Sequence, residues 1–434
     1  MESIWTQTEV LPQYPPLDND GKTDVLIIGG GMAGLLCARL LTDAGVDCMV
    51  LEAKRIGCGI TKNTTAKVTS QHGLIYHRLM KRFGPETAGL YLEANEKALT
   101  AYRNLCRDIP CDFTLQDNFI YSLDDPSILE AELRALEALG YPANYEQDLP
   151  LPFPTAGAVR FPQQAQFHPL KFIKGILPGL QIFENSPVRQ LMPHYAMTDK
   201  GTVTAQNIIV ATHFPILNKH GMYFLKMYQQ RSYVLALDGA PETKGMYLDG
   251  SGKGLSFRNY QGQLLLGGGG HRTGKPGSAW SVLEDFAKRH YPDAKITHRW
   301  AAQDCITLDG IPYIGRYSKG TQGLYVATGF NKWGMTSSMA AAQILTDLIT
   351  RGACLYESVF SPSRSILRPQ LALNALESTK NLLTPTTPRC PHLGCALKWN
   401  PQEHSWDCPC HGSRFEADGT LIDNPATGNL KKRD

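Results

Sequence analysis

The sequence lacks the features of a secreted or membrane-spanning protein. Residues 1–22 contain no charged start followed by an apolar run, which is the pattern of a signal peptide. The longest apolar stretch, Val25 to Leu41, is interrupted by glycines and ends around Arg39, so it fits a strand–turn–helix better than a membrane span. We therefore expect a cytoplasmic protein with no transmembrane segment.

The chain also lacks a strong charge imbalance. Its net charge is +3 over 434 residues, of which 19% are charged, so composition gives no reason to expect nucleic acid as a partner. The one basic run, 431–433, is typical of a solvated tail. A chain of this length, without internal repeats, predicts two or three domains.

Cysteine, by contrast, is more frequent than a cytosolic enzyme usually needs, and it is unevenly placed. Of the eleven cysteines, seven are scattered without paired spacing, whereas four lie between Cys390 and Cys410. In a chain without a secretory signal, such a cluster favours a metal site over a disulfide framework.

A glycine-rich motif near the start predicts a dinucleotide site. Gly29, Gly31 and Gly34 lie between a predicted strand over 24–28 and a predicted helix over 33–44. They permit a tight turn, close approach of the pyrophosphate and close helix packing, respectively. The helix N-terminus offers free N–H groups to the phosphates, and Glu52, at the end of the next strand, can accept hydrogen bonds from the adenosine ribose.

Three further segments resemble the D-amino-acid-oxidase-like family of FAD enzymes, which includes glycine and sarcosine oxidases. They are residues 55–61, residues 207–212 together with Val188, and residues 309–315 followed by 323–329 and a helix from Thr336. The resemblance spans residues 23–352 and favours FAD over NAD. It implies that the last helix points its N-terminus at the flavin and stabilises negative charge on the reduced ring. The predicted cofactor-binding residues are Gly29, Gly31, Gly34, Glu52, Arg55, Gly59, Thr61, Thr65, Val188, Ala211, Asp309, Gly329, Gly334 and Thr336.

Covalent attachment of the flavin is not expected. Some relatives attach FAD through a histidine in the segment corresponding to 59–67, where this sequence has none. Cys305 lies near the position where other relatives use a cysteine, but its spacing from the aspartate differs. We expect Cys305 to be a buried small residue.

Two short loops in the C-terminal cysteine cluster each offer one cysteine and one histidine. Cys390 pairs with His392, and Cys408 with His411, about eighteen residues further on. A Rieske 2Fe–2S centre needs two thiolates on one iron and two imidazoles on the other. A structural zinc site can also use two cysteines and two histidines. That alternative leaves Cys395, Cys410 and the Gly-Ser pair after His411 unexplained.

The loops resemble those of the respiratory Rieske proteins, which read Cys-x-His-x-x-Cys and Cys-x-Cys-His-Gly-Ser. The resemblance implies a disulfide between Cys395 and Cys410 and a hydroxyl, from Ser413, that hydrogen-bonds a cluster sulfur. Phe415 stands where those proteins have tyrosine, so we predict a reduction potential below their range. The module has only about 45 residues, too few to bury a large core, and we expect it to dock on the flavoprotein body or on another subunit. Leu397, Trp399, Trp406 and Phe415 are its expected small core.

These patterns together predict an α/β fold with a Rossmann-like FAD-binding domain, an α+β substrate domain and a small all-β Rieske module. Residues 79–139 are expected to be mainly helical and 222–269 to form short strands. The predicted boundaries are an N-terminal arm at 1–22, the FAD-binding domain at 23–80, 151–215 and 300–355, the substrate domain at 81–150 and 216–299, a linker at 356–388 and the Rieske module at 389–434.

The family resemblance implies oxidation of a carbon beside an amine nitrogen. The candidate catalytic residues are Lys67, His271 and Lys332, with Thr65 and Trp333 also expected near the flavin. Arg231, Tyr233, Arg258 and Tyr260 lie on predicted substrate-domain strands and can hold a carboxylate.

The leading interpretation is therefore a dehydrogenase for a small amine or amino acid. Its electrons pass from the flavin to the cluster and on to an external carrier. The alternatives are a reductase running in the opposite direction on an unsaturated substrate, or an electron-transfer or redox-sensing protein without turnover. A Rieske oxygenase is disfavoured because no two-histidine, one-carboxylate iron site is evident. The sequence leaves a homo-oligomer open.

Overall fold

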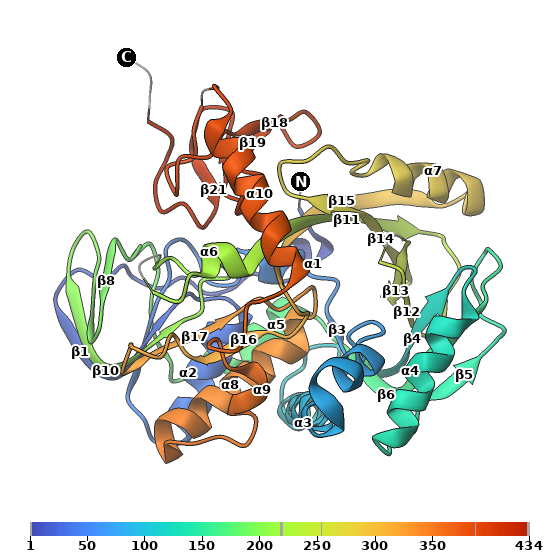
Figure 1. Cartoon of the computed structure of the whole chain (residues 1–434), viewed down its shortest axis with the longest axis horizontal. Helices are drawn as coiled ribbons and strands as arrows, with labels where there is room; N and C mark the ends of the chain where they lie inside the picture. Colours follow the sequence, from blue (N-terminus) through green and yellow to red (C-terminus); the bar gives the residue numbers. More distant parts are fainter. Residues whose placement is uncertain (1, 218–219, 253, 387, 432–434) are drawn as a thin grey trace.

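The computed structural model describes residues 2–217, 220–252, 254–386 and 388–431, and it contains three β-sheets. Two large sheets form the body, and a four-stranded sheet lies at one side of it, close to β11, β15 and α10 (Figure 1). The last two residues of the predicted basic run 431–433 are outside the described residues. None of the described helices is long and apolar enough to cross a membrane.

The first sheet is the predicted Rossmann-like one. Its main path runs β16–β17–β10–β1–β2–β7, and the order of the parallel strands β10, β1 and β2 shows that the chain returns to the sheet beside its first strand. Residues 25–28 of β1 are buried, as expected for a strand covered on both faces. The strands are β1 (Gly21–Ile28), β2 (Cys48–Leu51), β7 (Gln181–Phe183), β8 (Gln190–Met192), β9 (Tyr195–Met197), β10 (Thr202–Val210), β16 (Tyr313–Arg316) and β17 (Leu324–Thr328).

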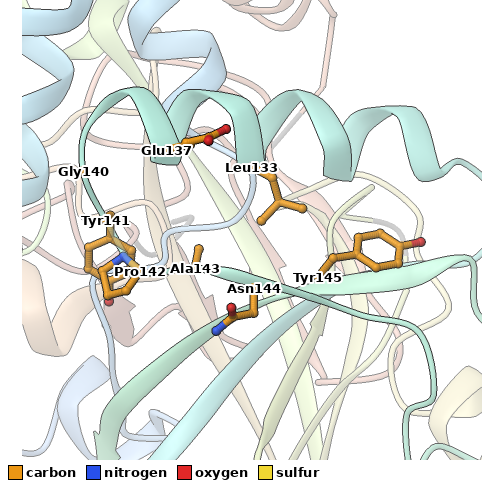
Figure 2. Close-up of a pocket in the computed structure, with 8 residues that line it drawn as sticks. All are labelled: Leu133, Glu137, Gly140, Tyr141, Pro142, Ala143, Asn144 and Tyr145. Atoms are coloured by element: carbon orange, nitrogen blue, oxygen red, sulfur yellow. The ribbon is translucent and has the colours of Figure 1, made fainter.

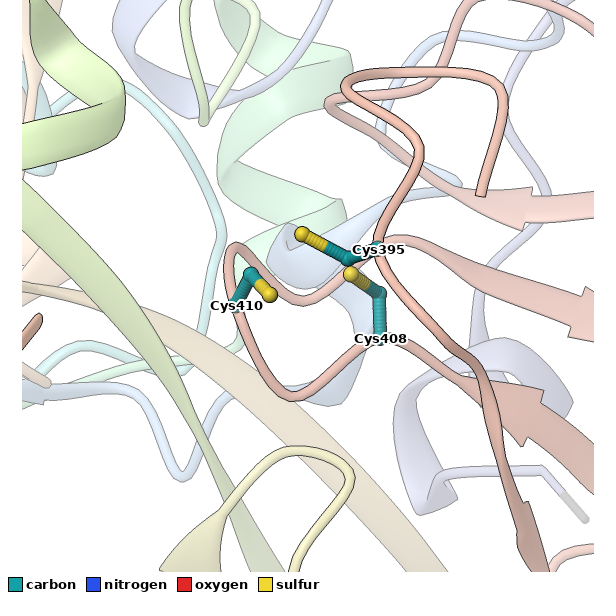
Figure 3. A group of neighbouring side chains, drawn as sticks. All are labelled: Cys395, Cys408 and Cys410. Atoms are coloured by element: carbon teal, nitrogen blue, oxygen red, sulfur yellow. The ribbon is translucent and has the colours of Figure 1, made fainter. Parts of the chain in front are cut away.

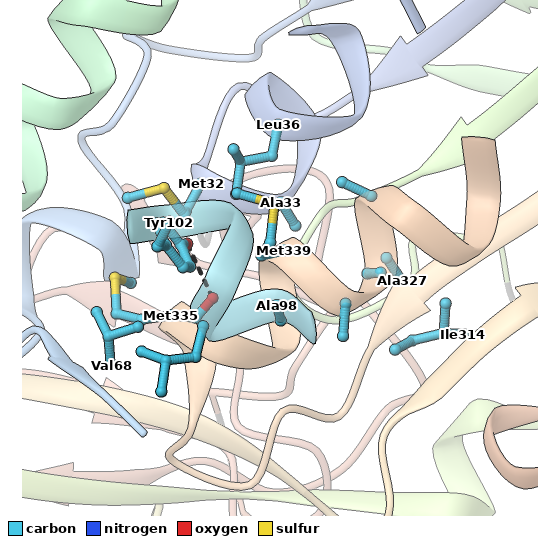
Figure 4. Close-up of a cluster of buried hydrophobic side chains, with 14 of the residues drawn as sticks. Met32, Ala33, Leu36, Val68, Ala98, Tyr102, Ile314, Ala327, Met335 and Met339 are labelled. Atoms are coloured by element: carbon cyan, nitrogen blue, oxygen red, sulfur yellow. Dashed lines mark hydrogen bonds between the residues drawn. The ribbon is translucent and has the colours of Figure 1, made fainter. Parts of the chain in front are cut away.

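Helix α8 (Gly334–Arg351) packs against both α2 (Met32–Asp43) and α3 (Tyr76–Leu105). Figure 4 shows their contact, in which Met32 and Leu36 of α2 lie near Met335 and Met339 of α8. The Tyr102 hydroxyl of α3 donates to the Met335 carbonyl at 2.9 Å. This packing holds the N-termini of α2 and α8 close together, although about 300 residues separate them in the sequence.

The second sheet has nine strands, with the main path β15–β11–β14–β13–β12–β4–β6–β3. Its strands are β3 (Lys67–Val68), β4 (Thr114–Ser122), β5 (Asn144–Glu146), β6 (Gly157–Gln166), β11 (Met227–Asp238), β12 (Met246–Asp249), β13 (Ser256–Tyr260), β14 (Gln263–Arg272) and β15 (Lys295–Thr307). Helices α4 (Pro126–Ala138) and α7 (Ser281–His290) accompany it. Helix α3 is kinked at Gly84, where φ is 84° before Pro85.

Residues 79–139 are mainly helical, as expected, with α3 and α4 on either side of β4. The strand pairing differs from the predicted domain ranges in three places. β3 falls inside the predicted FAD-binding range 23–80, yet it pairs with β6 in the second sheet. β6 and most of β15 fall inside the predicted FAD-binding ranges 151–215 and 300–355, yet both pair in the second sheet. Which sheet a strand joins depends on pairing with residues far away in the chain, and local hydrophobic periodicity does not carry that information.

The predicted linker 356–388 contains two helices, α9 (Glu357–Phe360) and α10 (Pro369–Leu383). Pro369 occupies the first turn of α10, where its missing N–H costs nothing and its fixed φ suits a helix. The predicted linker therefore contains helical structure at residues 369–383, and its bounds remain a prediction. Pro369, one of the prolines that suggested a linker, begins the helix.

The C-terminal module is an antiparallel four-stranded sheet, as the all-β prediction required. It consists of β18 (Lys398–Asn400), β19 (Ser405–Asp407), β20 (Arg414–Glu416) and β21 (Leu421–Asp423). Its small core contains Leu397, Phe415, Ala426 and the four cysteines, with Trp406 packed against it. Trp399, which was expected in this core, is 41% exposed because it lies on the outer face of β18.

The N-terminal arm is tied to the body at its first turn. Trp5, in α1 (Ile4–Thr8), is fully buried, and its indole N–H donates to the Thr64 carbonyl at 2.7 Å. Thr64 follows the 3-10 turn η1 (Ile60–Asn63). The arm therefore supports the segment that the sequence placed beside the flavin. The remaining helices are α5 (Pro169–Ile176) and α6 (Tyr223–Lys226).

Candidate functional site

The glycine-rich turn between β1 and α2 has the shape that a dinucleotide pyrophosphate requires. A Cβ added to Gly29, whose φ is 112°, would lie 2.5 Å from the Ala211 carbonyl oxygen, and one added to Gly34 would lie 1.9 Å from the Gly29 oxygen. Gly29 and Gly34 therefore allow backbone segments to touch. Gly31 differs, because the nearest atom to its added Cβ is the Thr61 hydroxyl at 3.5 Å. The turn thus leaves open space where a phosphate would approach.

We expect Gly34→Ala to impair FAD binding, because its methyl group must push α2 away from the turn. Overpacking of this kind costs about 1–3 kcal/mol or more. The FAD content of the purified protein, measured by absorbance, should fall well below one per chain. Gly320→Ala is the matched control, since nothing lies within 4 Å of an added Cβ there. Full FAD occupancy in the Gly34 variant would contradict this account of the turn.

Glu52 is held at the end of β2 by backbone donors. Its carboxylate accepts hydrogen bonds from the Gly30 and Lys54 N–H groups, each at 2.8 Å. Burial raises the pKa of Glu52, while these two hydrogen bonds oppose that shift. The carboxylate is therefore fixed beside the turn, where the predicted ribose contact would be made.

The turn before α8 lies beside the segment that carries Lys67. The Thr336 hydroxyl donates to the Thr69 carbonyl at 2.7 Å and accepts from the Thr69 N–H at 3.0 Å. Gly329, Asn331 and Lys332 all have positive φ, so the chain turns sharply between β17 and α8. Thr336 thus connects two segments that are predicted to contact the flavin. Its hydroxyl makes this connection through its hydrogen bonds with Thr69.

Several other predicted cofactor residues have structural partners. Arg55 pairs with Glu184 at 2.8 Å, and Asp309 pairs with Arg364 at 2.7 Å. Thr61 accepts from the Met32 N–H through its hydroxyl at 3.1 Å. The others are placed as follows: the Thr65 carbonyl accepts from Arg258, Val188 is in the core of the first sheet, Ala211 touches the glycine turn, Gly334 begins α8 and Gly59 has open space around it.

Among the catalytic candidates, Lys67 is the one enclosed in the body near the Thr336 connection. Its ammonium group donates to the Tyr247 carbonyl at 3.2 Å. Burial, together with the nearby charge of Arg258, lowers the pKa of Lys67 to about 7. A lysine with this pKa can exchange a proton near neutral pH.

Arg231, Tyr233 and His271 contact one another or the C-terminal module. Arg231 and the Tyr233 hydroxyl both contact the carboxylate of Glu403, which belongs to the C-terminal module. The Tyr233 hydroxyl also lies 2.9 Å from His271 Nε2. Sequence patterns placed Arg231 and Tyr233 on strands correctly, but they could not show that the module covers this face of the sheet.

Arg258 and Tyr260 are also engaged within the protein. Arg258 is buried, donates to the carbonyls of Thr65 and Phe167, and lies over the ring of Trp5. The Tyr260 hydroxyl donates to Asp112 at 2.6 Å. The predicted carboxylate-binding arginines are therefore both committed to other partners.

Asp304 is a candidate that the sequence interpretation missed. It lies in β15, and its carboxylate interacts electrostatically with Lys332. The one charged residue in the run 300–306 was the available signal, since a charged side chain there must face a polar space. Trp333, next to Lys332, stacks on His72 with ring centroids 5.0 Å apart.

Two tight loops present the cysteines and histidines of the C-terminal module. In the first, the Gly394 N–H donates to the Cys390 carbonyl at 2.9 Å, and in the second the Gly412 N–H donates to the Cys408 carbonyl at 2.9 Å. The sulfurs of Cys395, Cys408 and Cys410 lie within 4.8 Å of one another (Figure 3). The Cys390 thiol contacts that of Cys408. The four sulfurs are thus gathered at the junction of the loops.

The two imidazoles lie together on the side of the loops that faces the body. The ring centroids of His392 and His411 are 5.0 Å apart, with an interplanar angle of 87°. Burial lowers the pKa of His392 to about 4 and that of His411 to about 3, so both rings are neutral at pH 7, as metal ligands must be. Nε2 of His411 is buried with no hydrogen-bond partner among the residues that the structure describes. This donor set of two thiols and two neutral imidazoles fits a Rieske cluster.

Cys395 and Cys410 are free thiols in the structure, and their predicted disulfide remains a prediction. The Ser413 hydroxyl hydrogen-bonds the Cys390 thiol and accepts from the Ala426 N–H at 3.0 Å. It therefore lies where the predicted hydroxyl contact with the cluster requires it. Phe415 is fully buried in the module core, and the lower potential inferred from it also stays a prediction.

The histidine side of the module docks on the body through aromatic rings and backbone hydrogen bonds. The Phe214 ring lies 6.2 Å from His392 and 6.3 Å from His411, measured between centroids. Gln229 donates to the His411 carbonyl at 2.8 Å, and Gln303 donates to the Gly412 carbonyl at 2.9 Å. The module is therefore fixed to the body at the loop that carries His411.

A surface pocket elsewhere on the molecule contains none of the predicted site residues. It lies between α4 and β5 and is lined by Leu133, Glu137 and residues 140–145 (Figure 2). Glu137 is its one charged side chain. Nothing in this lining connects it to the flavin or cluster sites.

Comparison with known proteins supports both the flavin-binding body and the cluster-binding module. Residues 24–348 match the model of the FAD dependent oxidoreductase family, and residues 366–433 match that of the Rieske [2Fe-2S] domain. The second match includes α10, so it begins before the predicted module boundary at 389. It also decides between an iron–sulfur cluster and the zinc alternative.

Three similar proteins illustrate the relationship. YhfW of Bacillus subtilis, a Rieske 2Fe-2S iron-sulfur protein, is 34% identical over 100% of this chain and 97% of its own. Gamma-glutamylputrescine oxidoreductase of Escherichia coli is 25% identical over 78% of this chain and 86% of its own. The structure of glycine oxidase from Geobacillus kaustophilus superimposes with a TM-score of 0.67, at 18% identity, over 80% of this chain and 100% of the other.

The glycine turn, the paired Cys–His loops and the extent of these matches lead to one conclusion. The chain is an oxidoreductase that uses FAD and a Rieske 2Fe–2S cluster, and it belongs to the FAD dependent oxidoreductase family.

Proposed function

We propose that the protein is a dehydrogenase for a small amine or amino acid, in which electrons pass from the flavin to the Rieske cluster and on to an external one-electron carrier. When bound, the flavin supplies two-electron hydride acceptance and the cluster supplies one-electron transfer. The substrate loses a hydride from the carbon beside nitrogen, and the resulting iminium is hydrolysed by water.

One observation carries this proposal, namely the short continuous path between the two cofactor sites. The Ala211 carbonyl, at the end of β10, touches the glycine turn, and Phe214, three residues later, faces both imidazoles. Asn424 of the module donates to the Phe214 carbonyl at 2.9 Å and also bonds the Thr212 carbonyl. The two sites are therefore connected through one ordered segment of backbone.

The chain's own groups position the reactants. Thr336 and Thr69 hold the α8 turn against the Lys67 segment, and the Rossmann turn orients the dinucleotide. Lys67, with its pKa of about 7, is the group we propose to take the proton from a protonated substrate amine. That transfer leaves the nitrogen lone pair free to expel the hydride.

Anaerobic mixing tests the proposal directly. The holoenzyme is mixed with a panel of amines and amino acids while the flavin absorbance is followed, and samples are frozen for EPR. We expect the flavin to bleach and the reduced-cluster signal to appear, and an added one-electron acceptor to restore both. Bleaching of the flavin with no EPR signal from the cluster would show that the cluster does not accept electrons from the flavin. No bleaching by any amine, with rapid oxidation of the reduced enzyme by an enone, would support the reverse reaction instead.

We further propose that the protein acts in the cytoplasm, where a diffusible carrier reaches the module. Separation of cell extracts into membrane, periplasmic and cytoplasmic fractions checks this, and recovery with the membranes would contradict it. A light-scattering mass of the purified holoenzyme would decide whether it forms a homo-oligomer.

A further inference from the structure

The two faces of the second sheet have different roles along β11 and β15. Arg231 pairs with Gln303 in the register of these strands, and Gln230 pairs with Asp304. Because side chains alternate along a strand, Arg231 and Gln303 share one face, while Asp304 lies on the other. Arg231 and Gln303 both contact the Rieske module. Asp304 therefore points away from the module.

The face that carries Asp304 also meets the turn before α8. An added Cβ at Gly270 would lie 3.5 Å from the Lys332 ammonium nitrogen and 3.7 Å from the Ser232 hydroxyl. Ser232, two residues from Gln230 along β11, shares the face of Asp304. Lys332 lies in the turn that leads into the N-terminus of α8, which the family resemblance directs at the flavin. Asp304 thus lies at the flavin end of the second sheet.

The Asp304 carboxylate has no hydrogen bond or ion pair within the part of the chain that the structure describes, although its side chain is only partly exposed. Burial raises its pKa to about 6, and the charges of Lys332 and Arg231 oppose that shift. The carboxyl group is therefore ionised at pH 7.5. A partly buried carboxylate without a direct partner is costly unless a ligand compensates it.

The positive side chains that would recognise a substrate carboxylate are, in contrast, already engaged. Arg231 is paired with Glu403, and Arg258 is bonded to two backbone carbonyls. The charged groups that remain on this side of the sheet are therefore the carboxylate of Asp304 and the ammonium group of Lys332. Burial lowers the pKa of Lys332.

We propose that Asp304 binds an ammonium group of the substrate that is not the nitrogen being oxidised, so that the substrate is a diamine or another amine with a second cationic nitrogen. The inference rests on the proposed amine oxidation. Hydride loss requires the reacting nitrogen to be unprotonated, whereas a carboxylate stabilises the protonated form of any amine beside it. A carboxylate is therefore suited to the nitrogen that does not react.

The test compares three probes of equal chain length on the holoenzyme: putrescine, butylamine and γ-aminobutyrate. Dissociation constants come from the perturbation of the flavin absorption spectrum, or from the concentration dependence of anaerobic reduction where a probe is oxidised. We expect putrescine to bind about tenfold more tightly than either other probe. Asp304→Asn should abolish that preference and leave butylamine binding unchanged.

Asp285→Asn is the matched control, because Asp285 is an exposed residue of α7 in the same sheet region. Retained flavin absorbance and cluster EPR signal in Asp304→Asn would show that the variant is folded. The inference is overturned if Asp304→Asn binds putrescine as the wild type does. It is also overturned if γ-aminobutyrate binds more tightly than putrescine, or if putrescine does not perturb the wild-type flavin at all.

These outcomes separate the inference from the proposed function. Reduction of the flavin by amines with no effect of Asp304→Asn would remove the role of Asp304 and leave amine oxidation in place. Tight putrescine binding that depends on Asp304, without reduction of flavin or cluster, would instead contradict the proposed function.

Discussion

Replacing Cys408 with serine is expected to abolish the EPR signal of the reduced cluster and to leave the flavin absorption band intact. Cys408 is the cysteine whose sulfur lies close to those of Cys390, Cys395 and Cys410, so its loss removes a thiolate at the centre of the site. The irons of such clusters are held by thiolates, and a serine hydroxyl does not replace one in strength. Transfer of electrons from the flavin to a one-electron acceptor should then fall to background.

The measurements are the iron-to-FAD ratio, the EPR spectrum of dithionite-reduced protein and the rate of acceptor reduction. Cys354→Ser is the matched control, because Cys354 is a free, half-buried thiol outside the module. An unchanged cluster signal in Cys408→Ser would remove Cys408 from the ligand set. Loss of FAD together with the cluster would show that the variant has misfolded, and His411→Ala, tested by the same assays, would then decide whether the second loop holds the cluster.

Glu403→Gln is expected to loosen the Rieske module from the body. The Glu403 carboxylate accepts from Arg231 at 3.0 Å, from Arg414 at 2.9 Å and from the Tyr233 hydroxyl at 3.0 Å, and all three contacts are buried. Arg414 also pairs with Asp407 and Asp423, whereas Arg231 has no other carboxylate partner among the described residues. Breaking a buried ion pair in this way costs about 3–5 kcal/mol.

Electron transfer from flavin to cluster should slow in Glu403→Gln, since docking sets the relative position of the two cofactors. Stopped-flow absorbance measures that rate, and limited proteolysis of residues 361–388 reports whether the module has come away. Glu416→Gln is the control, because Glu416 is exposed on β20 of the same module. A double variant, Glu403→Gln with Arg231→Met, should recover part of the loss, because it no longer leaves a guanidinium buried and unpaired. Wild-type transfer rates in Glu403→Gln would contradict the docking role.

The docking of the module also places the cluster histidines against the flavoprotein body. Both imidazoles face Phe214 of the body, and the loop of His411 is bonded to Gln229 of β11. The imidazole side is the edge of a Rieske cluster that the thiolate side chains leave uncovered. In this protein that edge is turned toward the flavoprotein body, which fits the expectation that a module of this size cannot stand alone.

The cofactors were predictable from the sequence by itself. A strand, three glycines, a helix and an acidic residue at the next strand end specify a dinucleotide turn through local geometry, as Gly29, Gly34 and Glu52 show. The paired Cys–His loops specify a cluster through ligand chemistry, and Cys390, His392, Cys408 and His411 indeed come together. Both signals depend on residues close together in the chain, and for that reason spacing alone reveals them.

The surroundings of the substrate were decided by the tertiary structure. Arg231, Tyr233 and Arg258 have the chemistry to hold a carboxylate, but Glu403, more than 170 residues after Arg231, and the carbonyls of Thr65 and Phe167 occupy them. Asp304, which the sequence interpretation missed, keeps a carboxylate without such a partner among the described residues. The role of a side chain depends on which groups, distant in the sequence, contact it in the folded protein. Those contacts form only when the two sheets and the module pack together.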